Sequence, residues 1–158
     1  MTKEIIIGTR GSALALWQSR TVAESISASV DIKTIKTTGD RLLTIPLQGR
    51  VEKGFFTKEI EDYLLRGDID VAVHSLKDLP TEMHPDLTIG AYLTRAPVSD
   101  VLLIHPDWLD ESQLVPLKQG CRVGATSLRR QALLKLYAPH VEPTFLRGNV
   151  PTRIGRCQ

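Results

Sequence analysis

The chain has 158 residues, a length that suits one ordinary domain or two small ones. Hydrophobic residues make up 42% of it, a usual value for a globular protein, which argues against disorder. The formal net charge of +2 excludes a strongly basic nucleic-acid binder, and no apolar run approaches the roughly 18 residues of a membrane helix. The N-terminus lacks the pattern of a secretory signal, so we expect a cytoplasmic protein.

The first half of the chain predicts strands that alternate with helices. Short β-branched apolar runs favour strands, and apolar repeats at helical spacing favour helices between them. The expected elements are, in order, strand 4–9, helix 13–28, strand 31–38, helix 57–66 and strand 69–75. Ser12 is the expected N-cap of the first helix, and Gly67 is the expected stop of the second. Residues 44–54 have the composition of a loop, which is long enough to suggest a mobile lid.

The second half continues the alternation. The expected elements are strands 87–94 and 100–105, a short helix at 108–114, strand 121–126, helix 127–138 and strand 141–146. Arg95, Ala96 and Pro97 form a candidate hinge. Strands that alternate with helices predict an α/β fold with mostly parallel sheets flanked by helices.

Arginines gather at three predicted strand ends. They are Arg10, the pair Arg129 and Arg130, and the group Arg147, Arg153 and Arg156. Two arginines at a helix N-terminus are unfavourable unless an anion is present, and that end also offers free N–H groups to an anion. Each arginine could instead face solvent or pair with an acidic residue. Three clusters at the ligand-binding ends of a parallel sheet favour a bound polyanion.

The dipeptide Lys77-Asp78 belongs to the same edge, because it follows strand 69–75 directly. Nearby cations favour the ionised form of Asp78, which could stabilise a cationic intermediate or accept a hydrogen bond from a ring N–H. The alternative is a turn with a weak local ion pair. His74 is interpreted as a structural histidine, and the scattered histidines and two cysteines form no metal-ligand pattern. We expect free thiols and no metal site.

Five segments make the sequence specific. They are IGTRGSALALWQ (7–18), KTTGDR (36–41), VAVHSLKDLPTE (71–82), GATSLRRQALL (124–134) and LRGNVPTR (146–153). Together they resemble the porphobilinogen deaminase (hydroxymethylbilane synthase) family, in order and over essentially the whole chain. The resemblance implies an enzyme of tetrapyrrole (haem) biosynthesis that joins four porphobilinogen units head to tail and releases ammonia. It also implies a covalently attached dipyrromethane cofactor, whose carboxylates would be the expected polyanion.

The resemblance also implies roles for particular residues. Asp78 matches the catalytic aspartate, which stabilises positive charge on the pyrrole nitrogens. The residues that match cofactor-binding positions are Lys77, Ser75, Ser127, Arg129 and Arg130, and Asn149 belongs to the same motif. The residues that match substrate-side positions are Arg10, Ser12, Gln18, Arg147 and Arg153, with Phe56 beside the pocket.

The chain departs from the family pattern in two ways. Ala125 stands where the family usually has serine, which removes one hydroxyl near the cofactor. Neither Cys121 nor Cys157 matches the cysteine that anchors the cofactor. The expected organisation is two similar domains that resemble periplasmic binding proteins, the first at 1–96 and an incomplete second at 97–158, without the third, cofactor-anchoring domain. We therefore expect a truncated chain that is inactive alone.

Two other functional hypotheses remain open. The first is a non-catalytic anion-binding α/β module, which turnover of porphobilinogen would distinguish from the enzyme. The second, nucleic-acid binding, is weak because aromatic residues are few and the basic residues form no stripe. We expect porphobilinogen as the small-molecule partner, no nucleic acid and no membrane. Self-association through strands 121–126 and 141–146 is also expected.

Overall fold

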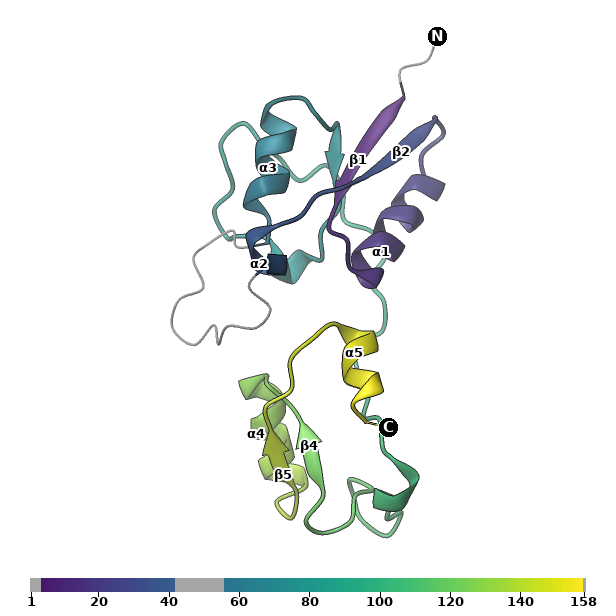
Figure 1. Cartoon of the computed structure of the whole chain (residues 1–158), viewed down its shortest axis with the longest axis vertical. Helices are drawn as coiled ribbons and strands as arrows, with labels where there is room; N and C mark the ends of the chain where they lie inside the picture. The colour runs from purple at the N-terminus through teal and green to yellow at the C-terminus, as the bar shows by residue number, and fades with distance from the viewer. Residues whose placement is uncertain (1–3, 42–55, 158) are drawn as a thin grey trace. The chain divides into compact units, whose positions relative to one another are not determined.

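The computed structural model of the chain describes residues 4–41 and 56–157 (Figure 1). The chain divides into two compact units, unit 1 within residues 1–94 and unit 2 within residues 95–158. Each unit has its own parallel sheet and its own helices. Among the described residues, no helix combines the length and the apolar character needed to cross a membrane. The predicted loop 44–54 lies outside the described residues.

Unit 1 contains a three-stranded parallel sheet in the order β2-β1-β3. Strand β1 (Ile5–Thr9) lies in the centre, between β2 (Val30–Thr34) and the short β3 (Val71–Ala72). In the register of β1 and β2, Ile7 pairs with Ile32. Because the three strands run in the same direction, the residues that follow β1 and β3 leave the sheet at the same edge.

The two main helices of unit 1 begin and end near the residues that the sequence predicts. Helix α1 (Ala13–Glu24) follows Ser12, whose hydroxyl accepts a hydrogen bond from the Ala15 N–H at 3.2 Å. Helix α3 (Lys58–Leu65) stops just before Gly67, which has a φ of +74°. The N-cap and the left-handed glycine are both confirmed. Helix α1 ends earlier than expected, at a serine-rich turn.

The core of unit 1 is made of isoleucines from the sheet side and from α3. Ile35, Ile60 and Ile69 form one buried cluster. Gly8, the fourth of the five residues of β1, makes this packing possible. A Cβ on Gly8 would lie 2.3 Å from Cδ1 of Ile69, a distance shorter than any normal contact. Ile69 therefore packs closely against the backbone of β1 at Gly8, where the strand has no side chain.

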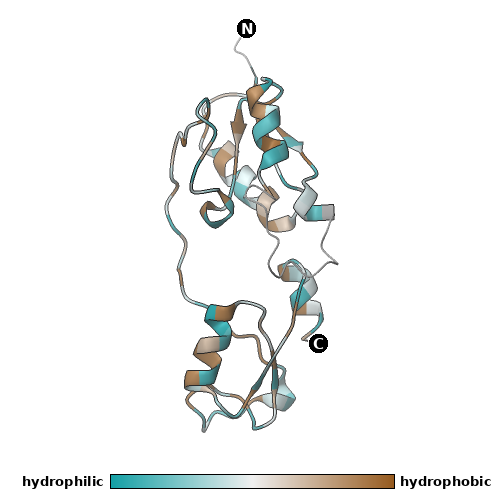
Figure 2. Cartoon of the chain, turned by 90° about the vertical axis from the view of Figure 1, so that its left-hand side faces the viewer, coloured by the Kyte–Doolittle hydropathy of each residue, from teal (hydrophilic) through white to brown (hydrophobic). Residues whose placement is uncertain are grey.

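Unit 2 repeats the same construction on a smaller scale. Strands β4 (Arg122–Gly124) and β5 (Glu142–Thr144) pair in parallel, and helix α4 (Leu128–Tyr137) connects them. A second helix, α5 (Val150–Gly155), follows β5 and was not predicted. The buried cluster of this unit consists of Leu117, Cys121, Ala138 and Val141. Figure 2 shows that the helices of both units carry hydrophobic as well as hydrophilic residues.

Three predicted elements of the middle of the chain are wrong. Residues 87–94 and 100–105 form no strand, and 108–114 form no helix, although a single turn, η2 (Pro106–Trp108), begins nearby. Their apolar side chains are largely exposed, Val101 to 83%. A strand exists only where a neighbour completes its hydrogen bonds, and none does so within the described residues. The remaining strands are present but shorter than predicted, for the same reason.

The α/β class with parallel sheets and flanking helices is confirmed. The likeness to periplasmic binding proteins and the assignment of domains at 1–96 and 97–158 stay predictions.

Candidate active site

The expected catalytic residue, Asp78, lies at the edge of the unit 1 sheet where β1 and β3 end. It closes η1 (Leu76–Asp78), a single turn that comes after β3. Arg10 directly follows β1, and its Nη1 lies 3.9 Å from Oδ2 of Asp78. Both side chains are largely buried, with 19% of Arg10 and 27% of Asp78 exposed. The parallel sheet thus brings together two expected site residues from distant parts of the sequence.

The guanidinium of Arg10 has further contacts on two sides. Oδ1 of Asp40 accepts hydrogen bonds from Nε of Arg10, at 3.1 Å, and from Nη2. The ring of Phe56 faces the guanidinium, with 4.3 Å between Cζ and the ring centroid. Phe56 was expected beside the pocket, and the structure shows it in contact with Arg10. Arg10 therefore lies between two carboxylates and against an aromatic ring.

Asp40 belongs to α2 (Thr38–Arg41), a four-residue helix too short for a sequence pattern to predict. Burial alone raises the pKa of its carboxyl group. Hydrogen bonds from Arg10 and Thr37 outweigh that effect, and the pKa lies below its ordinary value of 3.8. Asp40 is therefore ionised at neutral pH and pairs with Arg10 as a carboxylate.

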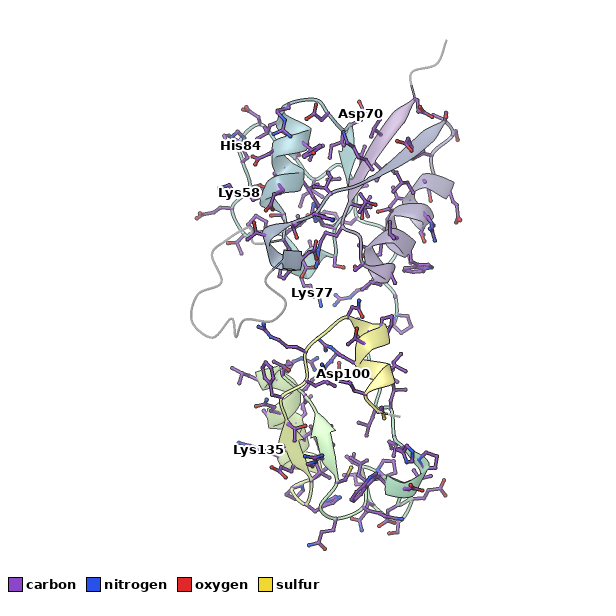
Figure 3. All side chains as sticks on the ribbon, in the orientation of Figure 1. Lys58, Asp70, Lys77, His84, Asp100 and Lys135 are labelled. Atoms are coloured by element: carbon purple, nitrogen blue, oxygen red, sulfur yellow. The ribbon has the colours of Figure 1, made fainter. Side chains whose placement is uncertain are left out.

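Other expected site residues of unit 1 lie at the same sheet edge. The Ser75 hydroxyl donates a hydrogen bond to Oε1 of Gln18 at 3.0 Å, which joins the turn after β3 to helix α1. Ser12 is engaged as the N-cap of α1. Lys77 is exposed, and Figure 3 shows it at the end of unit 1 where α2 lies. Within the described residues, Lys77 forms no ion pair and remains open to an anion.

His74, just before this turn, is half-buried. Burial lowers its pKa from the ordinary value of 6.5, while the negative charges of Glu61 and Asp78 act in the opposite direction. His74 is therefore neutral at neutral pH, and its structural role stays a prediction.

In unit 2, the two arginines at the start of α4 share one carboxylate. Arg129 donates from Nη1 to Oδ2 of Asp100 at 2.7 Å and from Nη2 to Oδ1 at 3.1 Å. Arg130 donates from Nε to the same Oδ1 at 3.2 Å. Hydrogen bonds from Arg129 are the main cause of a lowered pKa at Asp100, which is labelled in Figure 3. The pairing with an acidic residue, one of the alternatives from the sequence, therefore occurs at this cluster.

The remaining expected residues of unit 2 have local partners. Asn149 caps α5, and its Oδ1 accepts hydrogen bonds from the Thr152 N–H at 3.0 Å and from the Thr152 hydroxyl. Arg153 donates to the backbone oxygen of Gly148 at 2.7 Å. The guanidinium of Arg147 lies 5.7 Å from the ring centroid of Phe145. The two hydrogen bonds from Thr152 give Asn149 a structural role, as the N-cap of α5, that the sequence pattern did not indicate.

Ser127 occupies the N-cap position of α4 without a side-chain capping bond. Its hydroxyl therefore has no role in starting the helix. Ala125, the departure from the family pattern, is buried on the preceding turn.

The two cysteines form no disulfide. Cys121 and Cys157 are both free thiols, and burial raises the pKa of Cys121. Among the described residues, no group of three or more histidine, cysteine or acidic side chains is arranged to hold a metal ion.

Comparison with known proteins identifies the family. A family model described as "Porphobilinogen deaminase, dipyromethane cofactor binding domain" matches residues 5–158. The chain belongs to the porphobilinogen deaminase family. The resemblance seen in the sequence segments is confirmed.

Curated relatives named porphobilinogen deaminase show how far the similarity extends. The protein of Syntrophomonas wolfei is 50% identical over 99% of this chain. The proteins of Helicobacter hepaticus and Carboxydothermus hydrogenoformans are 43% and 42% identical over 96% and 100% of it. The chain spans 51%, 47% and 51% of these three proteins, about half the length of each.

The porphobilinogen deaminase family model is named for a dipyrromethane cofactor, and a donor set of unit 2 fits the carboxylates of such a group. Arg129 holds Asp100 through two parallel N–H···O bonds, the geometry that arginine adopts with any carboxylate. Arg130 adds a second guanidinium to the same carboxylate. The cluster therefore retains a formal charge of +1 and unused N–H donors, which suit a further carboxylate.

Two acidic residues of these clusters, Asp40 and Asp100, were not assigned from the sequence. Asp40 stands in the segment KTTGDR, which carried the family resemblance but had no role attached to it. The available signal was the segment itself, whose glycine the structure explains: a Cβ on Gly39 would lie 2.1 Å from the Phe56 ring. Asp100 stands in a segment that was expected to be a strand, and no local pattern marks it.

Proposed function

We propose that this chain carries the catalytic carboxylate and the carboxylate-binding side chains of hydroxymethylbilane synthesis. In this reaction, a transferase of tetrapyrrole biosynthesis joins four porphobilinogen units head to tail and releases ammonia at each step. The observation that carries the proposal is the largely buried Asp78 at the sheet edge, 3.9 Å from Arg10. Membership of the porphobilinogen deaminase family supports it.

The proposed role of Asp78 is to stabilise positive charge on the pyrrole nitrogens while ammonia leaves and the new bond forms. A largely buried carboxylate interacts more strongly with such a charge than one in water, because the surroundings are less polarisable.

The cofactor, when bound, supplies the pyrrole to which the first porphobilinogen unit is added. The residues that we propose to hold its carboxylates are those at the matching positions of the family motifs: Lys77, Ser75, Ser127, Arg129, Arg130 and Asn149. Arg10, Ser12, Gln18, Phe56, Arg147 and Arg153 are proposed for the substrate side. Arginine suits acetate and propionate groups because its fork matches the two oxygens of a carboxylate.

We also propose that the two units correspond to two similar domains, with boundaries at 1–96 and 97–158, in a soluble cytoplasmic enzyme. The parallel βαβ construction of each unit supports this proposal.

The test compares Asp78→Asn with Asp86→Asn, whose carboxylate is 78% exposed. The rate of ammonia release from porphobilinogen is measured in a protein preparation in which the wild type is active. Binding of porphobilinogen is measured by calorimetry. Asp78→Asn is expected to lower the rate of release at least about 100-fold because a group that stabilises developing charge is lost. Asp86→Asn should leave the rate unchanged. Equal rates for the two variants would contradict the role of Asp78.

A non-catalytic anion-binding module is the second candidate, and the arginine pair at the start of α4 favours it. It predicts that the chain binds porphobilinogen or other carboxylates without ever releasing ammonia. Release of ammonia that depends on porphobilinogen would therefore count against this candidate.

A further inference from the structure

We propose that Asp40 is the positioning residue for Arg10. It holds the guanidinium so that Nη1 faces the carboxylate of Asp78. The contact itself does not depend on the function proposed above, but its consequence for turnover does. Asp40 acts through Arg10, because the guanidinium lies between it and Asp78.

The hydrogen bonds define the orientation of Arg10. Oδ1 of Asp40 accepts from both Nε and Nη2, so one edge of the planar guanidinium is committed to Asp40. The remaining nitrogen, Nη1, is the one that lies 3.9 Å from Asp78. Because the guanidinium is planar, hydrogen bonds along one edge also fix the direction in which the remaining nitrogen points. Asp40 therefore determines where the free N–H donors of Arg10 point.

Asp40 is itself held by a second set of hydrogen bonds. Its Oδ2 accepts from the Thr37 N–H at 3.3 Å and from the Thr37 hydroxyl at 2.8 Å. Thr37 is completely buried, so its position is determined by the core of unit 1. The two oxygens of Asp40 have different partners: Oδ2 fixes the carboxylate to its own turn and Oδ1 fixes Arg10.

The turn that carries Asp40 is tied to helix α3. Oε1 of Glu59 accepts a hydrogen bond from the Thr38 N–H at 2.7 Å and another from the Thr38 hydroxyl. Gly39 packs against the Phe56 ring, which in turn lies against the guanidinium. A continuous series of contacts thus leads from α3 through α2 to Arg10.

The charges give this arrangement a chemical consequence. Asp40, Arg10 and Asp78 together carry a formal charge of −1 when all three are ionised. A network with this charge attracts a cation more than an anion. The network as a whole therefore stabilises the positive charge that develops on a pyrrole substrate, while the N–H donors of Arg10 that are not bound to Asp40 stay available to a substrate carboxylate.

The experiment observes Arg10 directly in the 158-residue chain. The Nε–H signals of arginines are recorded by ¹⁵N NMR, and their exchange with water is measured in the wild type and in Asp40→Asn. Loss of a charge-assisted hydrogen bond is expected to speed the exchange at Arg10 Nε about tenfold. Thr37→Val removes a hydrogen bond to Oδ2 without touching Arg10, and its effect should be smaller than that of Asp40→Asn.

The matched control is the exposed pair Arg66 and Asp68. Nε of Arg66 donates to Oδ2 of Asp68 at 2.8 Å, and the guanidinium lies 4.7 Å from the Tyr63 ring centroid. This pair has the same chemistry as Arg10 and Asp40 but with 56% and 44% of its side chains exposed. Asp68→Asn is expected to change exchange at Arg66 by less than about twofold because exposed pairs are held weakly. It should not affect Arg10.

A second measurement needs no variant. In the wild type, the ¹³Cγ shift of Asp40 and the Nε–H signal of Arg10 are followed as the pH is lowered. The two should change with the same midpoint, because protonation of Asp40 releases Arg10. Different midpoints, or unchanged exchange at Arg10 in a folded Asp40→Asn variant, would overturn the proposal.

The functional consequence is tested separately. Asp40→Asn is expected to lower the kcat of ammonia release about tenfold, with a smaller change in KM, because it disturbs the orientation of groups in the transition state. If Arg10 is released in the variant but no preparation turns over porphobilinogen, the proposed function fails while the positioning role stands. If exchange at Arg10 is unchanged, the positioning role fails whatever the turnover.

Discussion

Asp40 is held between an arginine and a threonine, an arrangement that acid disrupts. Because its pKa in the folded chain lies below the ordinary value of 3.8, the stability it contributes is fully present above that value. The contribution is lost as the pH falls through the pKa of the folded chain. Urea unfolding should show Asp40→Asn less stable than the wild type by about 1–2 kcal/mol near neutral pH. The difference should shrink toward zero in acid; a difference independent of pH would contradict this account.

The carboxylate of Asp100 also has a lowered pKa, but its surroundings differ. Arg129 and Arg130 have 63% and 48% of their side chains exposed, so salt screens their pairing with Asp100. We expect the effect of Asp100→Asn on unfolding to be smaller than that of Asp40→Asn and to fade as salt is added. Unfolding curves at low and high salt check this, and an effect that persists at high salt would show that the pair is better shielded than its exposure indicates.

At the scale of secondary structure, two serines in equivalent positions allow a matched comparison. Ser12 precedes α1 and its hydroxyl accepts from the Ala15 N–H, whereas Ser127 precedes α4 and makes no capping bond. Ser12→Ala is expected to cost about 1 kcal/mol in local stability, and Ser127→Ala nearly nothing. Amide hydrogen exchange in the first turn of each helix measures the two effects. Equal losses of local stability in the two variants would mean that the capping hydrogen bond of Ser12 does not stabilise α1.

At the scale of the whole molecule, the segment around the boundary of the two units exposes apolar surface. Its large exposed side chains include Tyr92, Leu93, Val98, Val101 and Leu103. Because this backbone has no strand partner within the described residues, it offers hydrogen-bonding groups together with apolar side chains. We therefore expect this surface, in addition to the strands of unit 2, to take part in self-association.

Sedimentation velocity tests that expectation with two matched variants. Val101→Lys should raise the fraction of monomer several-fold, because it places a charge in the apolar segment. Leu114→Lys changes a side chain that is equally exposed, 82% against 83%, but lies elsewhere in unit 2. It should leave the distribution unchanged. A wild-type chain that is monomeric at all concentrations would contradict self-association.

The sequence by itself determined the features that depend on near neighbours. The N-cap at Ser12, the left-handed stop at Gly67 and the βαβ alternation of both units follow from residues a few positions apart. The family, too, was evident from short segments. The position of Asp78 on a turn that follows a strand also comes from local sequence, because the apolar run 69–73 and Pro80 bracket it.

The tertiary structure alone decided which charges meet. Arg10 and Asp40 are 30 residues apart in the sequence, and Arg129 and Asp100 are 29 apart, so no local pattern could pair them. The strand predicted at 87–94 is absent for the same reason. A strand needs a partner that can lie far away in the sequence, and the described residues provide none for this segment. Hydrogen bonds within a helix or turn are closed by nearby residues, whereas ion pairs and strand ladders need a partner that only folding brings close.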